Sequence, residues 1–144
     1  MIIAIFINCL LVSIAVGIHY EMLRLLSVII PRLKIRHRLR VIIGVFGTIC
    51  AHIIEICMFG TAVFFMISYG DFGSLQGNFD GSLLDCVYFS FTNYTSLGYG
   101  DIEPLGNIRF LAGLEALTGL SLITWSASFM FLEMSKFWEE EEKD

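Results

Sequence analysis

One seven-residue stretch, Thr95 to Asp101 (TSLGYGD), has the residue types needed to bind a cation through its main chain. A cation that leaves water needs oxygen atoms in place of its hydration shell. Backbone carbonyls can supply them only if successive carbonyls point the same way. Gly98 and Gly100 alternate with bulkier residues, and glycine permits the positive φ that turns carbonyls toward one side. The stretch therefore predicts a cation-binding loop built from backbone oxygens.

The segment before this loop must position it. Ser82 and Asp85, three residues apart, fit a capping box, which predicts a helix that begins there and runs to Tyr94. A helix over residues 82–94 would be about 20 Å long, too short to cross a hydrocarbon core about 30 Å thick. We therefore expect it to enter the membrane and stop, with the loop over residues 95–101 directly after it.

The composition is that of a membrane protein. Of 144 residues, 56% are hydrophobic and 16% charged, whereas soluble domains have roughly 45–50% and about 25%. Apolar runs predict transmembrane helices over residues 1–19, 41–69 and 107–132. A formal charge of -5 argues against a nucleic-acid partner. No nucleophile–base constellation or phosphate loop is present, so neither catalysis nor a cofactor is expected.

The basic residues predict the orientation. Six of the nine Lys and Arg residues lie between residues 20 and 40, and residues 70–105 contain none. The positive-inside rule then makes residues 20–40 a cytoplasmic loop and places the N-terminus outside. Within this loop, residues 22–30 are expected to lie flat on the inner surface. Residues 133–144 are expected to form an acidic cytoplasmic tail.

The sequence CVYFSFTNYTSLGYGDIEP (residues 86–104) resembles the pore helix and selectivity filter of the potassium channels, and residues 107–132 resemble the inner helix that follows. The resemblance covers about residues 41–132, the ion-channel pore module. It implies an all-α integral membrane protein with three transmembrane helices, a re-entrant pore helix and a filter loop. One loop cannot surround an ion, so it also implies a homotetramer in the lipid bilayer. The implied activity is passive K⁺-selective conduction across the plasma membrane, with K⁺ as permeant ion.

The resemblance also implies roles for individual residues. Tyr99 would point away from the ion and pack behind the loop. Asp101 would hydrogen-bond to the pore-helix region. Independently of the resemblance, the positions of Thr92 and Glu115 in the sequence predict that they support the filter. The filter residues would be Thr95, Ser96, Leu97, Gly98, Tyr99 and Gly100. Among these, K⁺ would be bound at Ser96, Leu97, Gly98 and Tyr99.

Two residues depart from the family pattern and keep alternatives open. Ser96-Leu97 stands where the family usually has Thr-Val. Ser96 keeps the hydroxyl but lacks the stiffening methyl group, and Leu97 changes the packing behind the filter. A weakly selective cation channel is therefore an alternative. Another is a non-conducting membrane subunit that uses the first span and the basic loop to regulate an unidentified partner.

The third span has a polar stripe and two glycines of interest. Thr118, Ser121, Thr124 and Ser128 share one helical face and are predicted to line a water-filled cavity. Alternatively, their hydroxyls bond to carbonyls one turn earlier. Gly119, or else Gly113, is a hinge candidate, and the alternative is close helix packing through a small residue.

Ionisable residues inside the spans need a physical reason. His52 and Glu55 are neighbours on one helix face, and we expect them to pair with each other or with a neighbouring helix. Two ligands are too few for a metal site, so none is expected there. Glu115 is expected to brace the loop by hydrogen bonds near Thr92, Asn93 or Tyr94.

Overall fold

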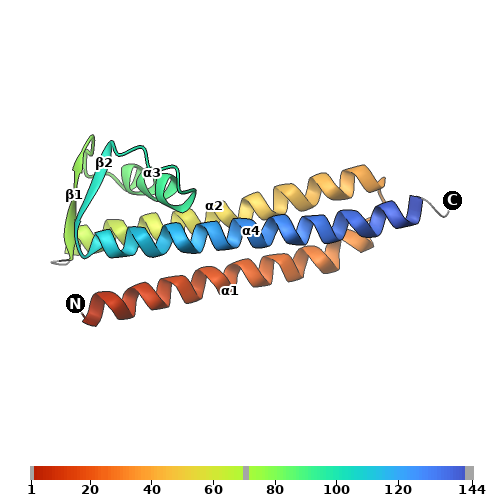
Figure 1. The fold of residues 1–144 in the computed structure, drawn as a ribbon, viewed down its shortest axis with the longest axis horizontal. Coiled ribbons are helices and arrows are strands. Elements are labelled where there is room, and N and C mark those ends of the chain that lie inside the picture. Colours follow the sequence, from red (N-terminus) through yellow and green to blue (C-terminus); the bar gives the residue numbers. More distant parts are fainter. Residues whose placement is uncertain (1, 70–71, 142–144) are drawn as a thin grey trace.

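Three long helices lie side by side along the molecule, and a short helix packs at one end of them (Figure 1). The computed structural model describes residues 2–69 and 72–141. All three long helices contain a stretch long and apolar enough to cross a membrane, which confirms the three predicted spans. The helices are α1 (Ile2–Arg32), α2 (His37–Tyr69), α3 (Leu83–Tyr94) and α4 (Ile108–Glu141).

Helix α1 is longer than expected, and most of the predicted basic loop is helical. The helix runs to Arg32 and α2 begins at His37, so only residues 33–36 connect them. The expectation that residues 22–30 lie flat on the membrane surface is wrong, because this segment continues along the axis of α1. At 1.5 Å per residue, the 31 residues of α1 span roughly 46 Å. The helix therefore extends beyond the hydrocarbon core, and its last turns carry Arg24 and Arg32.

A stripe of buried side chains along α1 explains why the helix continues past residue 19. Residues three, four or seven positions apart are buried, while large apolar side chains elsewhere on the helix are exposed, as expected beside lipid. Leu26 and Ile30 carry the stripe past residue 19 and pack with Val41 of α2 and Phe129 of α4. The buried residues are Ala4, Asn8, Ala15, His19, Leu23, Leu26 and Ile30.

A two-stranded antiparallel ribbon, which the all-α expectation did not include, closes the base of the segment that carries α3 and the loop. Strand β1 (Gly73–Gly77) pairs with β2 (Ile102–Gly106), so that Gly77 faces Ile102. The backbone N–H of Asn78 extends this pairing by donating to the carbonyl of Asp101, 2.8 Å away. The strands contain Gly73, Gly77 and Gly106, and glycine is depleted in strands, so the sequence carries no local strand signal. The partner of β1 also lies beyond α3 in the chain.

Helix α3 begins as the capping pattern predicts. Ser82 is the N-cap, and its hydroxyl accepts a hydrogen bond of 3.1 Å from the backbone N–H of Asp85. The backbone N–H of Ser82 donates in turn to Asp80, and hydrogen bonding to Ser82 lowers the pKa of the exposed Asp80 carboxyl. Residues 78–82 thus fix where α3 starts, one residue after the predicted boundary.

Helix α4 does not end at residue 132 but continues to Glu141. The predicted acidic tail over residues 133–144 is therefore helical as far as residue 141, and its last three residues lie outside the described part of the chain. Figure 1 shows the C-terminal end of α4 at the opposite end of the molecule from the ribbon and α3. The N-terminal end of α1 lies at the same end as α3.

Helices α2 and α3 touch where α2 has no side chain. A Cβ added to Gly60 would come within 2.6 Å of the Cα of Val87, which is backbone and cannot swing away. We predict that Gly60→Ala destabilises the folded protein by about 1–3 kcal/mol through overpacking, measured as a lower unfolding temperature in detergent. Gly17→Ala in α1 is the matched control, because a Cβ there meets nothing within 4 Å. Equal unfolding temperatures for the two variants would contradict this packing.

Candidate functional site

The loop that follows α3 has an alternating backbone. Ser96, Gly98 and Gly100 have φ angles of 57°, 53° and 75°, so every second residue of this stretch lies in the left-handed region. The two glycines adopt the positive φ that their spacing predicts. Ser96 was not predicted to do so, because a Cβ disfavours this conformation by roughly 1–2 kcal/mol. Within the described residues it is the one non-glycine with positive φ.

The loop folds back onto the C-terminal end of α3. The backbone N–H of Gly98 donates to the carbonyl of Thr92 over 3.0 Å, and that of Ser96 donates to the carbonyl of Asn93 over 2.8 Å. The hydroxyl of Thr95 bonds to the carbonyl of Phe91. These bonds use the last carbonyls of α3, which have no partner within the helix. Thr92 thus supports the loop through its backbone, and its own hydroxyl bonds to Phe89.

Asp101 ties the far end of the loop to α3 and to the ribbon. Its carboxylate accepts a hydrogen bond of 2.8 Å from the hydroxyl of Tyr88, in the middle of α3. Its carbonyl accepts the N–H of Asn78. The predicted hydrogen bond between Asp101 and the pore-helix region is therefore present. The loop is held at both ends, and between them it pairs with no strand among the described residues.

The side chains of the loop itself are uncovered within one chain. Residues 95–100 are all exposed, with Leu97 at 57% and Tyr99 at 67%. The prediction that Tyr99 packs behind the loop is therefore not met by contacts within its own chain. Tyr94, one residue before the loop, is by contrast fully buried. Burial ends where the alternating backbone begins.

Tyr94 belongs to a closed ring of hydrogen bonds in the protein interior, which we call the polar ring. It consists of His19, His52, Glu55, Tyr94 and Ser126, contributed by all four helices. Glu55 accepts from the hydroxyl of Tyr94 and lies 3.0 Å from His19. Ser126 Oγ lies 3.2 Å and 3.1 Å from Nε2 of His19 and His52. The Tyr94 hydroxyl lies 2.9 Å from Nδ1 of His52 and completes the ring.

The polar ring confirms one prediction and adds three residues. His52 and Glu55 contact each other, at 3.4 Å, and also neighbouring helices. His19, Tyr94 and Ser126 were missed, because their partners in the polar ring lie on other helices, far away in the sequence. The signal that could have found His19 is its place on the buried stripe of α1.

Glu115 is buried but does not brace the loop as predicted. Its side chain is fully buried, and neither carboxylate oxygen has a hydrogen-bond partner within the described residues. The hydroxyl of Ser90 in α3 lies near it without forming a regular hydrogen bond. Glu115 therefore faces the middle of α3 rather than bonding to Thr92, Asn93 or Tyr94.

Comparison with protein families shows which family this chain belongs to. A family model described as "Ion channel" matches residues 51–136, which include α3, the loop and most of α2 and α4. The chain belongs to this ion channel family. It is a family of two-transmembrane, pore-loop channels that includes K⁺ channels. Neither the curated proteins nor the solved structures contain a match.

The polar stripe of α4 is partly buried. All four hydroxyls bond to the carbonyl four residues earlier, as the alternative interpretation predicts. Thr118 is 8% exposed and packs inside the chain, whereas Ser121, Thr124 and Ser128 are exposed on one side of α4. These three remain the candidates for lining a cavity.

The two glycines of α4 have different surroundings. A Cβ on Gly119 would overlap the carbonyl oxygen of Tyr94 and come within 2.8 Å of its ring. The absence of a side chain at Gly119 therefore lets α4 contact the end of α3. A Cβ on Gly113 would meet nothing within 4 Å. Close packing is therefore the role that the contacts give to Gly119, and they give none to Gly113.

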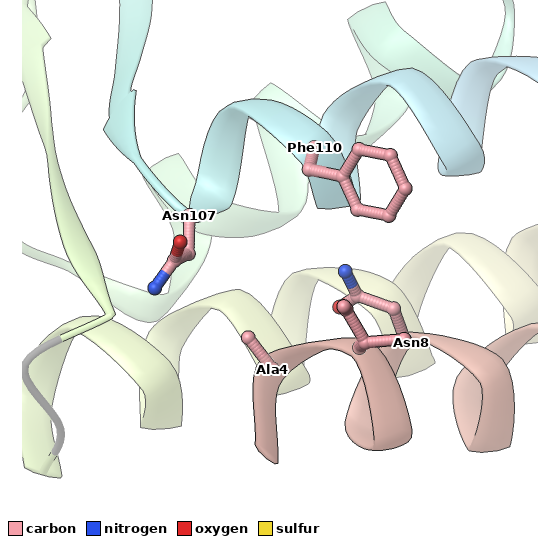
Figure 2. Close-up of a pocket in the computed structure, with 5 residues that line it drawn as sticks. Ala4, Asn8, Asn107 and Phe110 are labelled. Atoms are coloured by element: carbon pink, nitrogen blue, oxygen red, sulfur yellow. The ribbon is translucent and has the colours of Figure 1, made fainter. Parts of the chain in front are cut away.

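A cavity of about 310 Å³ separates the start of α1 from the start of α4 in the channel. It is lined by Ala4, Ile5, Asn8, Asn107 and Phe110. Figure 2 shows the Asn8 side chain directed from α1 toward Phe110. Asn8 is 1% exposed, and its amide has no hydrogen-bond partner within the described residues.

We predict that Gly119→Ala lowers ion flux through the channel about tenfold or more. The added methyl group would push α4 away from Tyr94, which directly precedes the loop, and overpacking of this kind favours the displaced arrangement by about 1–3 kcal/mol. Flux is measured in liposomes at equal protein content. Gly113→Ala is the matched control and should leave flux within about twofold, since its Cβ meets open space. A larger loss in Gly113→Ala than in Gly119→Ala would instead favour a hinge at Gly113.

Proposed function

We propose that this ion channel is K⁺-selective and conducts K⁺ passively through a filter formed by four TSLGYG loops. The observation that carries the proposal is the alternation of positive φ at Ser96, Gly98 and Gly100. Neighbouring residues of opposite handedness turn their carbonyls toward the same side, which suits dehydrated cation binding. In this proposal, the carbonyl oxygens of residues 96–99 bind K⁺ and the Ser96 hydroxyl contributes the innermost site.

The placement of α3 supports a cation below the loop. The helix ends at Tyr94 immediately before the filter, so its C-terminal end carries the partial negative charge of the helix dipole. The backbone of the loop is irregular at membrane depth, which is tolerated only where protein buries it or water lines it. Loops from neighbouring copies and a water-filled path would meet that requirement.

Exposure of the filter side chains supports a homotetramer. Leu97 and Tyr99 are more than half exposed in the single chain, although both are large and apolar or aromatic. One loop offers oxygen atoms on one side of an ion only. Four copies around a common axis would surround the ion and also cover these side chains.

The charge distribution supports an orientation with the filter end outside the plasma membrane. Helix α1 starts at the filter end (Figure 1), and the basic residues cluster around the α1–α2 connection at the other end. By the positive-inside rule that connection is cytoplasmic. Asp80, Asp85, Asp101 and Glu103 then lie in a segment without Lys or Arg, and their charge would concentrate cations at the entrance.

A weakly selective cation channel is the second candidate, and Leu97 favours it. Its side chain is 57% exposed, so nothing in its own chain fixes the packing behind the filter. The two candidates share the same pore and differ in the permeability ratio of K⁺ to Na⁺.

The selectivity is tested by reversal potentials of the purified protein in bilayers with K⁺ on one side and Na⁺ on the other. We expect the unmodified protein to reverse close to the K⁺ equilibrium potential. Gly98→Ala should shift the reversal potential toward zero or abolish the current, because alanine at φ 53° costs roughly 1–2 kcal/mol and would flip carbonyls of the filter.

Gly81→Ala is the matched control for backbone strain. Gly81 has φ 87°, and a Cβ there meets nothing within 4 Å, as at Gly98. It lies before α3 and outside the filter, so its reversal potential should equal that of the unmodified protein. Equal K⁺ and Na⁺ permeability in the unmodified protein would favour the weakly selective candidate. Absence of current would favour a non-conducting subunit.

The assembly is tested by native mass spectrometry of the detergent-solubilised protein. We expect a mass of four copies of the 16.3 kDa chain, because only a ring of loops can enclose an ion. Crosslinks through a cysteine placed at Tyr99 should join neighbouring chains, whereas a cysteine at Leu84 on the exposed start of α3 is the comparison position. A protein that stays monomeric in lipid nanodiscs would refute the four-loop filter.

A further inference from the structure

We propose that the polar ring binds a divalent transition-metal ion of the Zn²⁺ type, with His19, His52 and Glu55 as its ligands. One donor atom from each of these residues lies within 4.8 Å of the other two. His19 and Glu55 are fully buried. The third ligand comes from α1, far from the other two in sequence, so the two-ligand argument drawn from the sequence no longer holds.

Two of the distances between donor atoms are close to those around a tetrahedral ion, and the three donor atoms together lie within 4.8 Å of one another. Nδ1 of His19 lies 3.0 Å from one oxygen of Glu55, and Nδ1 of His52 lies 3.4 Å from the other. Ligands at about 2.0–2.1 Å from Zn²⁺ in a tetrahedron are about 3.4 Å apart. Two imidazoles with one carboxylate suit Zn²⁺ and its neighbours, whereas Mg²⁺ and Ca²⁺ prefer oxygen ligands.

Ser126 orients both imidazoles for this role. Its hydroxyl oxygen lies 3.2 Å from Nε2 of His19 and 3.1 Å from Nε2 of His52. A hydroxyl has two lone pairs, so it can accept an N–H from each ring. Both Nδ1 atoms are then unprotonated and face Glu55. Metal-binding histidines commonly donate their second N–H to a fixed acceptor in this way.

With both imidazoles neutral, hydrogen bonds leave the polar ring short of one proton, and either a protonated imidazole paired with Glu55 or a metal ion makes up the deficit. Closing its five contacts requires five protons, one for each contact. Neutral His19 and His52, Tyr94 and Ser126 supply four, and the Glu55 carboxylate supplies none. A metal ion between Glu55 and the two Nδ1 atoms provides the missing positive charge without an extra proton. Three of the four protons then fill the Tyr94–Glu55 contact and the two contacts to Ser126, and the fourth, on the Ser126 hydroxyl, stays free to donate.

The proposed ion would join α1 and α2 beside the start of the filter. The Tyr94 hydroxyl donates to Glu55 and lies 2.9 Å from Nδ1 of His52, so it borders the open fourth position. The His52 side chain retains 16% exposure, which provides an edge for the ion to enter. Because Thr95 follows Tyr94 directly, an ion here would also restrain the filter. This last consequence rests on the proposed function, but metal binding itself does not.

Binding is measured on the purified, chelator-treated full-length protein by titrating ZnCl₂ against a chromophoric zinc chelator. We expect one Zn²⁺ per chain. Glu55→Gln should weaken binding by about a hundredfold or more, and Ser126→Ala by about tenfold to a hundredfold, since it removes only the acceptor that orients both rings. His37→Gln replaces the third histidine of the chain, outside the polar ring, and should bind like the unmodified protein.

Two outcomes would overturn the site. Absence of stoichiometric Zn²⁺ binding would leave the polar ring as a hydrogen-bonded structure only. Binding unchanged in both Glu55→Gln and His19→Gln would place the ion elsewhere. If a variant fails to fold, Co²⁺ in the unmodified protein gives an independent readout: a tetrahedral site should show intense visible absorption that Zn²⁺ displaces, and the weak absorption of octahedral Co²⁺ would contradict the ligand set. Neither measurement requires the protein to conduct.

Discussion

The position of Tyr94 is the constraint on which the rest of the pore segment depends. Its backbone carbonyl lies against Gly119 of α4, at a distance that only a residue without Cβ allows. Its hydroxyl is held by Glu55 and His52 of α2. Because the side chain is fully buried and the next residue starts the exposed loop, these two contacts determine where the helix ends and in which direction the loop leaves it. The hydrogen bonds from Gly98 and Ser96 back to Thr92 and Asn93 then build the loop on that fixed end.

Helix α1 takes part in this constraint although it lies outside the residues that match the ion channel family. His19 reaches both Glu55 and Ser126, and so connects α1 to α2 and α4 through the polar ring. Such a polar cluster inside a membrane helix bundle is costly unless every member is satisfied. Loss of the His19 side chain would leave Glu55 with fewer partners in a buried site. The first helix is thus part of the interior that positions the pore segment, and the apolar stripe above and below His19 keeps it there.

The features that could be predicted depend on residues close together in the chain, whereas most of the features that were missed depend on residues far apart in it. The start of α3 follows from Ser82 and Asp85, and the backbone of Gly98 and Gly100 follows from residue type, since both signals are local. The positive φ of Ser96 comes instead from bonds that the loop makes with α3. The ribbon joins two strands that lie on either side of α3 and the loop in the chain. The polar ring requires residues from four helices. The length of α1 was underestimated because charge content was taken to mark a loop, whereas the packed stripe continues through the basic residues.

Tyr94 is fully buried and Tyr99 is mostly exposed, and this difference affects the free energy of the loop. Tyr94 is buried, and its hydroxyl is satisfied by Glu55 and His52 of the same chain. From Thr95 to Gly100, the backbone is fixed by hydrogen bonds while the side chains contact little. An exposed Leu97 and Tyr99 cost free energy in water, and burying a large apolar or aromatic side chain recovers about 1.5–3 kcal/mol. Association with other copies at this loop would therefore be favoured by Leu97 and Tyr99, which lie in the segment proposed to bind the ion. The same loop would then contribute both to the stability of the assembly and to the geometry of the proposed filter, and Tyr94 fixes the position from which it starts.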